Sequence, residues 1–169
     1  MVLGSSIIKH INGRTVKQRS TKYLKVACYP GADTEKVCDH AEVELKYSVP
    51  EVAILHAGGN DLANGEKIDD IADNLAYLGI ELKDRGVKRI AISGMTPRKD
   101  LKQQITDLNA ELKNMCKNYN YDFINNNNII YKNHLSYDQI HLNYKGVSIL
   151  QGNYISYLKR TKMDNGGEQ

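Results

Sequence analysis

Hydrophobic residues occur along this chain in two alternating kinds of block. Short continuous runs, typical of strands buried in a sheet, occupy 1–4, 22–30, 52–59, 87–95 and 121–129. Between these runs, apolar residues recur at every third or fourth position in 34–48, 67–86, 101–119 and 147–162. That spacing places them on one face of a helix. The pattern therefore predicts five strands, each followed by a helix or a helical turn.

Such alternation is typical of the α/β fold class. Parallel strands joined through helices make right-handed crossovers, and the helices cover both faces of the sheet. We expect a three-layer α/β/α arrangement around a five-stranded parallel sheet of flavodoxin-like order, with the active crevice at the carboxyl ends of the strands. Residues 1–162 form one domain in this interpretation, and 163–169 form a flexible tail. The first apolar run is short for a strand, so we expect a domain excised from a longer multidomain protein.

The composition is that of an ordinary globular domain. Hydrophobic residues make up 41% and charged residues 25% of the 169 residues. No apolar run approaches the roughly 18 residues of a transmembrane helix, and no signal-peptide pattern opens the chain. Cys28, Cys38 and Cys116 are odd in number and irregular in spacing, as expected for reduced thiols and not for a metal site. We expect a cytoplasmic, intracellular protein without a metal or cofactor.

The net charge of +3 is unevenly distributed. The first 32 residues carry six basic residues and no acidic one, and these basic residues lie in the segment 9–25. Such a segment attracts the phosphates of nucleic acid or of an anionic membrane surface. It is equally typical of a solvated loop, and the sequence does not decide between the two interpretations.

Short polar motifs follow four of the five predicted strands. They are Gly4-Ser5-Ser6, Pro30-Gly31-Ala32-Asp33, Gly58-Gly59-Asn60-Asp61 and, beyond the last strand, Asp138-Gln139-Ile140-His141. Because the carboxyl ends of parallel strands meet at one edge of a sheet, we expect these motifs to lie close together. A serine at a strand-to-helix corner is either a helix N-cap or a nucleophile. A histidine, a carboxylate and an amide at the same edge favour the nucleophile.

The set of motifs resembles the SGNH, or GDSL-type, hydrolase family. Its Gly-Asp-Ser block is matched by Gly4-Ser5-Ser6, which assigns the nucleophile to Ser6. The family glycine is matched by Gly31, and the two remaining blocks are matched in full around Asn60 and His141. The one departure is Ser5, where the family usually has aspartate. We expect Ser5 to keep a capping hydrogen bond at the turn.

The segments GSSI, HAGGNDL and DQIHLNYKG carry a second resemblance. They are similar to the esterase domain in the first open-reading-frame protein of vertebrate LINE-type (non-LTR) retrotransposons. This resemblance implies a multidomain parent with a coiled coil, in which RNA association resides in other parts of the protein. It also implies a role for the domain in retrotransposition.

These residues together predict a serine esterase. His141 would take the proton of the Ser6 hydroxyl and return it to the leaving alcohol, and Asp138 would orient the imidazole. The spacing of three residues predicts that Asp138 and His141 meet on a helical turn. The oxyanion would be bound by the backbone N–H groups of Ser6 and Gly31 and by the side-chain amide of Asn60.

The length of the chain limits the size of the ester. The predicted strands and helices leave no residues for a cap domain or a long lid, so we expect a shallow crevice that favours short acyl groups, acetyl first. Candidate crevice walls are Tyr137, Leu142 and Met95, together with Tyr144, Thr96 and Pro97. The expected substrate is a small acyl ester, carried either by a lipid or by another acetylated molecule.

Several polar residues have simpler interpretations. His56 lies inside an apolar strand and is expected to be a core histidine with its hydrogen bonds satisfied, and His134 is expected to pack within its loop. Asp61 would brace the asparagine loop, and Asp33 would cap the following helix. A different class of function stays open, because a catalytically silent module that binds RNA or a membrane could use the same fold and the basic segment.

Overall fold

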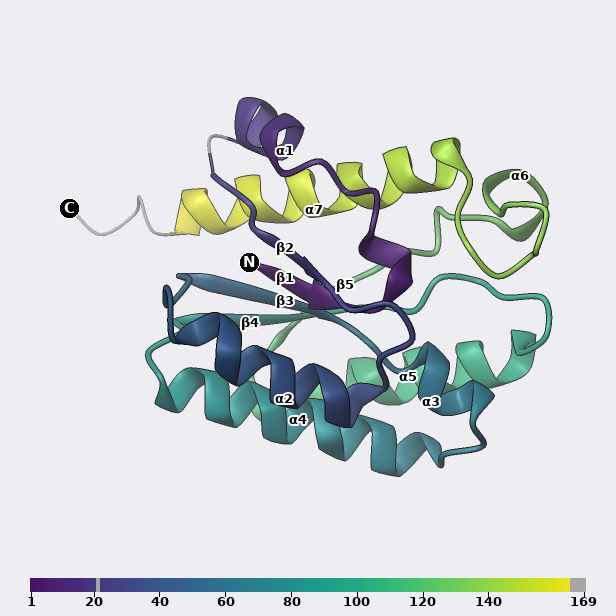
Figure 1. The fold of residues 1–169 in the computed structure, drawn as a ribbon, viewed down its shortest axis with the longest axis horizontal. Helices are drawn as coiled ribbons and strands as arrows, with labels where there is room; N and C mark the ends of the chain where they lie inside the picture. Colours follow the sequence, from purple (N-terminus) through teal and green to yellow (C-terminus); the bar gives the residue numbers. More distant parts are fainter. Residues whose placement is uncertain (21, 165–169) are drawn as a thin grey trace.

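The computed structural model describes residues 1–20 and 22–164. Its centre is a sheet of five strands, β1 (Val2–Gly4), β2 (Val26–Cys28), β3 (Val52–His56), β4 (Arg89–Ser93) and β5 (Asp122–Ile124). Their order is β2-β1-β3-β4-β5, and every neighbouring pair is parallel (Figure 1). This is the flavodoxin-like order that the sequence predicts.

Helices cover both faces of the sheet and confirm the three-layer arrangement. The helices α2 (Thr34–Leu45), α4 (Ile68–Asp84) and α5 (Lys102–Tyr119) lie on one face, and α1 (Gly13–Ser20) and α7 (Tyr144–Asp164) lie on the other (Figure 1). Three short helical segments, η1 (Ser6–Ile8), α3 (Gly59–Ala63) and α6 (Tyr131–His134), follow β1, β3 and β5. None of the described helices is long and apolar enough to cross a bilayer.

The strands are shorter than their apolar runs, because the runs continue into the loops that carry the polar motifs. The run 52–59, for example, ends as a strand at His56, and its last residue already belongs to α3. Helix α1 is an element that the sequence analysis did not predict. It occupies part of the basic segment and buries only Val16 and Ser20. Helix α7 extends to Asp164, and the rest of the predicted tail, 165–169, lies outside the described residues.

The alternation of side chains along β3 divides the core in two. Ala53 and Leu55 pack against α2, α4 and α5, whereas Val52 and Ile54 face α1 and α7. All five residues of β3 are buried, as expected for a central parallel strand covered on both faces. His56 ends the strand on the α7 side, directly below the carboxyl edge of the sheet.

The strand β1 lies between β2 and β3, with Gly4 opposite His56. A Cβ atom added at Gly4 would lie 2.3 Å from the carbonyl oxygen of His56, well inside the contact distance of two heavy atoms. Glycine is therefore required here by close backbone approach. The residues that follow Gly4 begin the candidate site, so this contact also sets their height above the sheet.

We expect Gly4→Ala to lower the free energy of unfolding by about 2–3 kcal/mol, because the added methyl group can only be accommodated by moving backbone. Gly152→Ala is the matched control, since Gly152 lies in α7 and, apart from its chain neighbours and the nearby backbone of its own helix, no atom lies within 4 Å of an added Cβ. Alanine should stabilise that helical position by up to about 1 kcal/mol. Urea denaturation of both variants measures the difference, and equal stabilities would contradict the proposed contact.

Candidate active site

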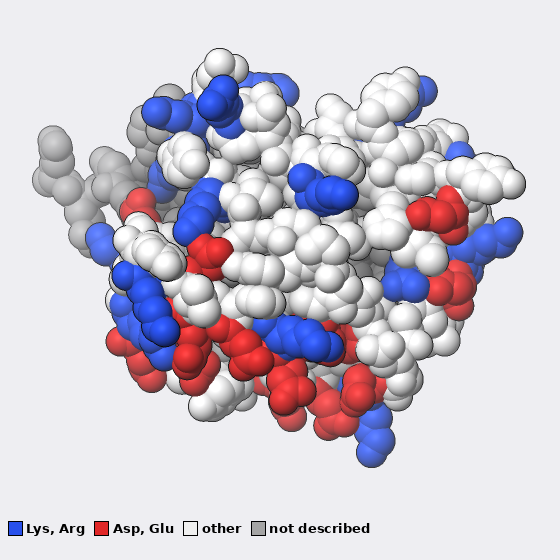
Figure 2. Space-filling view, in the orientation of Figure 1, with Lys and Arg blue, Asp and Glu red and all other residues white. Residues whose placement is uncertain are grey.

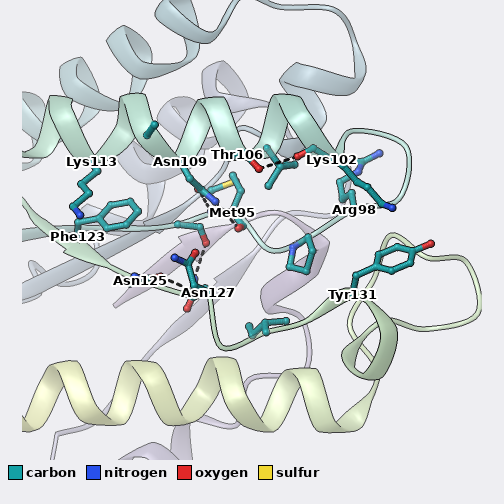
Figure 3. A pocket seen from close by; sticks show the side chains of 16 residues that line it. Met95, Arg98, Lys102, Thr106, Asn109, Lys113, Phe123, Asn125, Asn127 and Tyr131 are labelled. Carbon is teal, nitrogen blue, oxygen red and sulfur yellow. Dashed lines mark hydrogen bonds between the residues drawn. The ribbon is translucent and has the colours of Figure 1, made fainter.

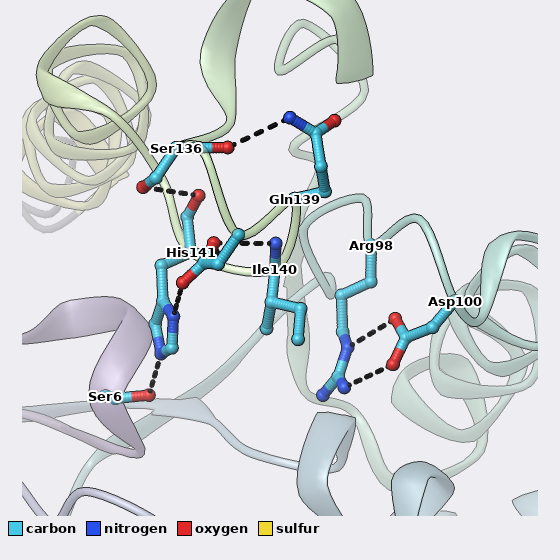
Figure 4. Close-up of polar contacts among 8 residues, drawn as sticks. Ser6, Arg98, Asp100, Ser136, Gln139, Ile140 and His141 are labelled. Carbon is cyan, nitrogen blue, oxygen red and sulfur yellow. Dashed lines mark hydrogen bonds and ion pairs between the residues drawn. The ribbon is translucent and has the colours of Figure 1, made fainter.

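The serine pair lies at the corner where β1 ends. Ser5 has extended backbone, and Ser6 begins the one-turn helix η1. The Ser5 side chain makes no capping hydrogen bond, so the expectation of a cap at this residue is wrong. The Ser6 hydroxyl instead lies 2.9 Å from Nε2 of His141, which comes from the opposite end of the chain (Figure 4). The corner thus presents Ser6 to the histidine and buries Ser5 beside it.

His141 is held by a tight turn and not by the helical turn that its spacing suggested. Gln139 has a positive φ of 61°, which reverses the chain between Asp138 and His141. Ser136 closes the turn, since its N–H and its hydroxyl both donate to the His141 carbonyl oxygen, at 2.7 and 3.1 Å. The sequence spacing therefore predicted the contact correctly and its backbone conformation wrongly.

Asp138 binds both the backbone of this turn and the imidazole. Its Oδ1 accepts from the N–H groups of Ile140 and His141, each at 2.9 Å, and its Oδ2 lies 2.7 Å from Nδ1 of His141. The two backbone N–H groups, followed by the imidazole, lower the pKa of the Asp138 carboxyl to about 2. An ionised carboxylate requires a proton on Nδ1, so the Nε2 lone pair of a neutral His141 faces the Ser6 hydroxyl.

The loops after β2 and β3 are fastened together. Asn60 donates from Nδ2 to the carbonyl oxygen of Ala32 at 2.8 Å. Asp61 is buried, and its Oδ1 accepts from both the N–H and the hydroxyl of Thr34, at 2.9 and 2.6 Å. The expected bracing role of Asp61 is confirmed, as is the capping of α2 by Asp33, which accepts from the backbone N–H of Lys36. An amide nitrogen carries two hydrogens, so Asn60 keeps one for another partner.

A cavity of about 230 Å³, hereafter the Ser6 pocket, connects these elements. Ser6, Asn60 and His141 line it together with Met95, and Met95 is thereby found where a crevice wall was expected. A second cavity of about 290 Å³ also borders Ser6 and His141, and its lining includes Leu142. Gly31 has a positive φ of 79° and is exposed, and it lines neither of these two cavities.

Tyr137 was expected to be a crevice wall, and that expectation is wrong. Its side chain is fully exposed and lines neither cavity beside Ser6. Tyr144 is also exposed. Tyr137 and its neighbour Asp138 are both exposed at the start of the tight turn, whereas Ile140 and His141 at its end line the Ser6 pocket. Sequence alone does not distinguish the two directions in an irregular loop.

Arg98 is a residue of the site that the sequence analysis missed. Its guanidinium binds Asp100 through two hydrogen bonds, at 3.1 and 2.8 Å (Figure 4). It also donates from Nη1 to the carbonyl oxygen of Gly59 at 3.0 Å. The next residue, Lys99, donates its backbone N–H to the Gln139 carbonyl oxygen. The loop after β4 is thereby tied both to the asparagine loop and to the histidine turn.

A larger groove of about 480 Å³ adjoins the Ser6 pocket. It lies between α5 and the loop 125–131, and Lys102, Lys113, Phe123 and Tyr131 are among its walls (Figure 3). Met95, Arg98 and Ile105 line both cavities and therefore form the partition between them. No local pattern in the sequence indicates this groove, because its walls come from separate elements that only folding brings together.

His56 is buried as expected, but only one of its two ring nitrogens has a partner among the described residues, since Nδ1 lies 2.9 Å from the hydroxyl of Ser93. That hydroxyl also accepts from Nδ2 of Asn126 at 2.9 Å and from the hydroxyl of Tyr154 at 3.1 Å. With both lone pairs in use, Ser93 donates its own proton to His56 Nδ1. The network thus keeps His56 neutral, with its proton on Nε2, and burial lowers the pKa of the imidazole to about 4.

The neutral state of buried His56 predicts a loss of stability in mild acid. The pKa of this histidine is lower in the native chain than its ordinary value of about 6.5, so between these values the unfolded chain binds the extra proton. The contribution of neutral His56 to the free energy of unfolding is complete above pH 6.5 and is lost as the pH falls toward 4. Relative to His56→Gln, the wild type should lose about 2 kcal/mol of unfolding free energy between pH 7.5 and 5. Urea titrations at both pH values test this, and parallel losses would refute it.

No model of a protein family matches the chain, and no curated protein matches it by sequence. Solved structures do match it in fold. A GDSL-like lipase from Bacteroides thetaiotaomicron superimposes with a TM-score of 0.78 at 16% identity, over 95% of this chain and 87% of that one. A lipase/acylhydrolase from Enterococcus faecalis gives 0.79 at 16% identity, over 95% and 94%.

An acetyl xylan esterase from Geobacillus stearothermophilus gives a TM-score of 0.76 at 14% identity, over 93% of this chain and 92% of that one. At such identities the similarity concerns the fold. The chain therefore has the three-layer α/β/α fold of the GDSL-type, or SGNH, hydrolases.

Proposed function

We propose that this protein is a serine ester hydrolase of the SGNH type that acts on short, acetyl-type carboxylic esters. One observation carries the proposal, namely the continuous chain from the Ser6 hydroxyl through His141 to Asp138, with distances of 2.9 and 2.7 Å. The fold of known lipases and esterases supports it, since this chain of residues lies at the carboxyl edge of the sheet where such a fold places its active crevice.

The catalytic steps follow from the protonation states of these residues. As the Ser6 oxygen bonds to the ester carbonyl carbon, its proton passes to Nε2 of His141, and Asp138 stabilises the resulting imidazolium. His141 then returns the proton to the alkoxide as the carbon–oxygen bond of the ester breaks, leaving the acyl group on Ser6. A water molecule, deprotonated by His141, releases the acid and restores the serine.

The oxyanion of each tetrahedral intermediate needs donors that are already in place. Helix η1 begins at Ser6, and the first N–H of a helix has no intrahelical acceptor, so that group is one donor. Asn60 offers its second amide hydrogen, because the first is used by Ala32. We retain the backbone N–H of Gly31 as the third proposed donor.

Replacing Ser6 by alanine should reduce the hydrolysis of p-nitrophenyl acetate to traces, because no other hydroxyl among the described residues lies within hydrogen-bonding distance of Nε2 of His141. Asn60→Ala keeps the nucleophile and should slow kcat by roughly 10²–10³. Ser148→Ala, at an exposed position of α7, is the matched control and should retain full activity. Purified Ser6→Ala protein that hydrolyses the ester as fast as the wild type would contradict the proposal. Rates along an acetate-to-octanoate series should fall with chain length.

We further propose that the domain belongs to the first open-reading-frame protein of a LINE-type retrotransposon and deacylates a lipid or another acetylated molecule there. The support is the similarity of the three sequence segments around Ser6, Asn60 and His141. The genomic neighbourhood tests it directly. A coiled coil encoded in the same frame and a reverse transcriptase encoded downstream are expected, and their absence would contradict the assignment.

A second candidate function is binding of a polyanion, RNA or an anionic membrane, and helix α1 favours it. Arg14, Lys17 and Arg19 project from α1 and form no ion pair with any described residue, whereas Lys22 and Lys25 pair with Glu51 and Glu44. Figure 2 shows basic side chains gathered around α1 and acidic ones along the edge formed by α2 and α4. This asymmetry would orient the domain on a negatively charged surface.

If α1 binds polyanions, the double variant Lys17→Glu/Arg19→Glu should weaken association with single-stranded RNA or phosphatidylserine vesicles at least tenfold at low salt. The dependence of affinity on salt should also become shallower, because fewer counterions are released. Lys83→Glu/Lys117→Glu, which reverses two charges on the other helical layer, is the control. Affinity that ignores the α1 change would remove this candidate while leaving the esterase proposal intact.

A further inference from the structure

Three polar side chains form the inner end of the Ser6 pocket. Ser5, His56 and Thr96 all line it, and their exposed fractions are only 8%, 2% and 3%. Hydroxyl and imidazole groups this deeply buried normally have hydrogen-bond partners. Within the part of the chain that the structure describes, however, Ser5 Oγ, His56 Nε2 and Thr96 Oγ1 accept from and donate to no protein atom.

These three atoms are reached through the pocket. Among the described residues, the one fully enclosed side-chain polar atom without a partner is Oδ2 of Asp61. The unpartnered ends of Ser5, His56 and Thr96 are therefore not sealed in the protein. Since each residue is buried and each lines the Ser6 pocket, that cavity is where their hydrogen bonds must be completed.

The hydrogen-bonding character of this inner end is fixed in part by the core. Ser93 donates to Nδ1 of His56, so Nε2 always carries a proton and acts as a donor toward the pocket. The two hydroxyl groups can donate or accept. No charged group belongs to this trio, and the positive charge of the nearby Arg98 is paired with the Asp100 carboxylate. The inner end thus suits a neutral group that contains a hydrogen-bond acceptor.

The acyl half of an ester is the part that would enter. His141 has to reach the leaving oxygen, and its side chain is 46% exposed, so the alcohol lies toward solvent. The acyl substituent then extends the other way, toward the buried inner end. The partition of Met95, Arg98 and Ile105 bounds the space that it can fill.

We propose that the Ser6 pocket selects short acyl groups that carry a neutral oxygen acceptor beyond the α-carbon, such as hydroxyacyl or alkoxyacyl groups, over alkyl chains of the same size. The inference rests on the proposed esterase function and names its substrate class. An alkyl chain would displace water from Nε2–H and two hydroxyls without replacing their hydrogen bonds, and a buried donor left unpaired is costly. An acetyl group ends at its α-carbon, so the same argument predicts no such cost for it.

The test compares two nearly isosteric esters, p-nitrophenyl methoxyacetate and p-nitrophenyl butyrate. Each kcat/KM is divided by the rate of hydroxide-catalysed hydrolysis, which removes the greater intrinsic reactivity of the methoxy ester. The wild type should prefer methoxyacetate, and Thr96→Val should reduce that preference roughly threefold to tenfold, the effect of one neutral hydrogen bond. Thr106→Val makes the same change on the groove side of the partition and should leave the preference unaltered.

The same preference is measured for Ser5→Ala and His56→Leu. Ser5→Ala provides a second pocket variant if the loss of His56 disturbs the core. Active enzyme with no normalised preference, or with a preference that none of the three variants changes, overturns the inference while the esterase function stands.

If no Ser6-dependent hydrolysis is found, the proposed esterase function is wrong. The preference of the pocket is then tested by measuring the binding of two unreactive amides. Methoxyacetamide should then bind the Ser6→Ala protein more tightly than butyramide, as followed by NMR of the His56 ring, and Thr96→Val should remove the difference. Equal affinities, or no binding of either amide, would overturn it.

Discussion

The site depends on the place of one three-residue strand in the sheet. β1 pairs with β2 on one side and β3 on the other, and it approaches β3 so closely that only glycine fits opposite His56. Because β1 ends at Gly4, the next residues are lifted above the sheet and Ser6 begins a helical turn. Every other component of the site is positioned relative to this corner by the loops that follow the other four strands.

Those loops are held together by polar side chains that bind backbone across them. Asp138 uses one oxygen for two backbone N–H groups and the other for His141, so the imidazole is oriented by the same carboxylate that shapes its turn. Arg98 and Asn60 do the equivalent for the loops after β4 and β3. Preorganisation of this kind places donors before the reaction begins, which is where most electrostatic stabilisation in catalysis originates.

The buried network around Ser93 connects the core to the pocket. It provides a hydrogen bond to Nδ1 of His56 and leaves Nε2 facing the cavity. The same imidazole therefore accepts a hydrogen bond in the core and offers an N–H donor to the pocket. This arrangement explains how a histidine in an apolar strand stays neutral and still turns a hydrogen-bond donor toward the Ser6 pocket. The stability of the core and the polarity of the pocket are thereby linked through one side chain.

The sequence by itself determined the alternation of strands and helices, the order of the sheet, and the motifs that bring Ser6, Asn60, Asp138 and His141 to one edge. It did so because hydrophobic periodicity and parallel topology act over short stretches that can be read directly. Only the tertiary structure decided the left-handed residue that shapes the histidine turn, the exposure of Tyr137, the part played by Arg98 and the polar inner end of the pocket. These depend on side chains from distant loops meeting at specific distances, and no local pattern encodes such encounters.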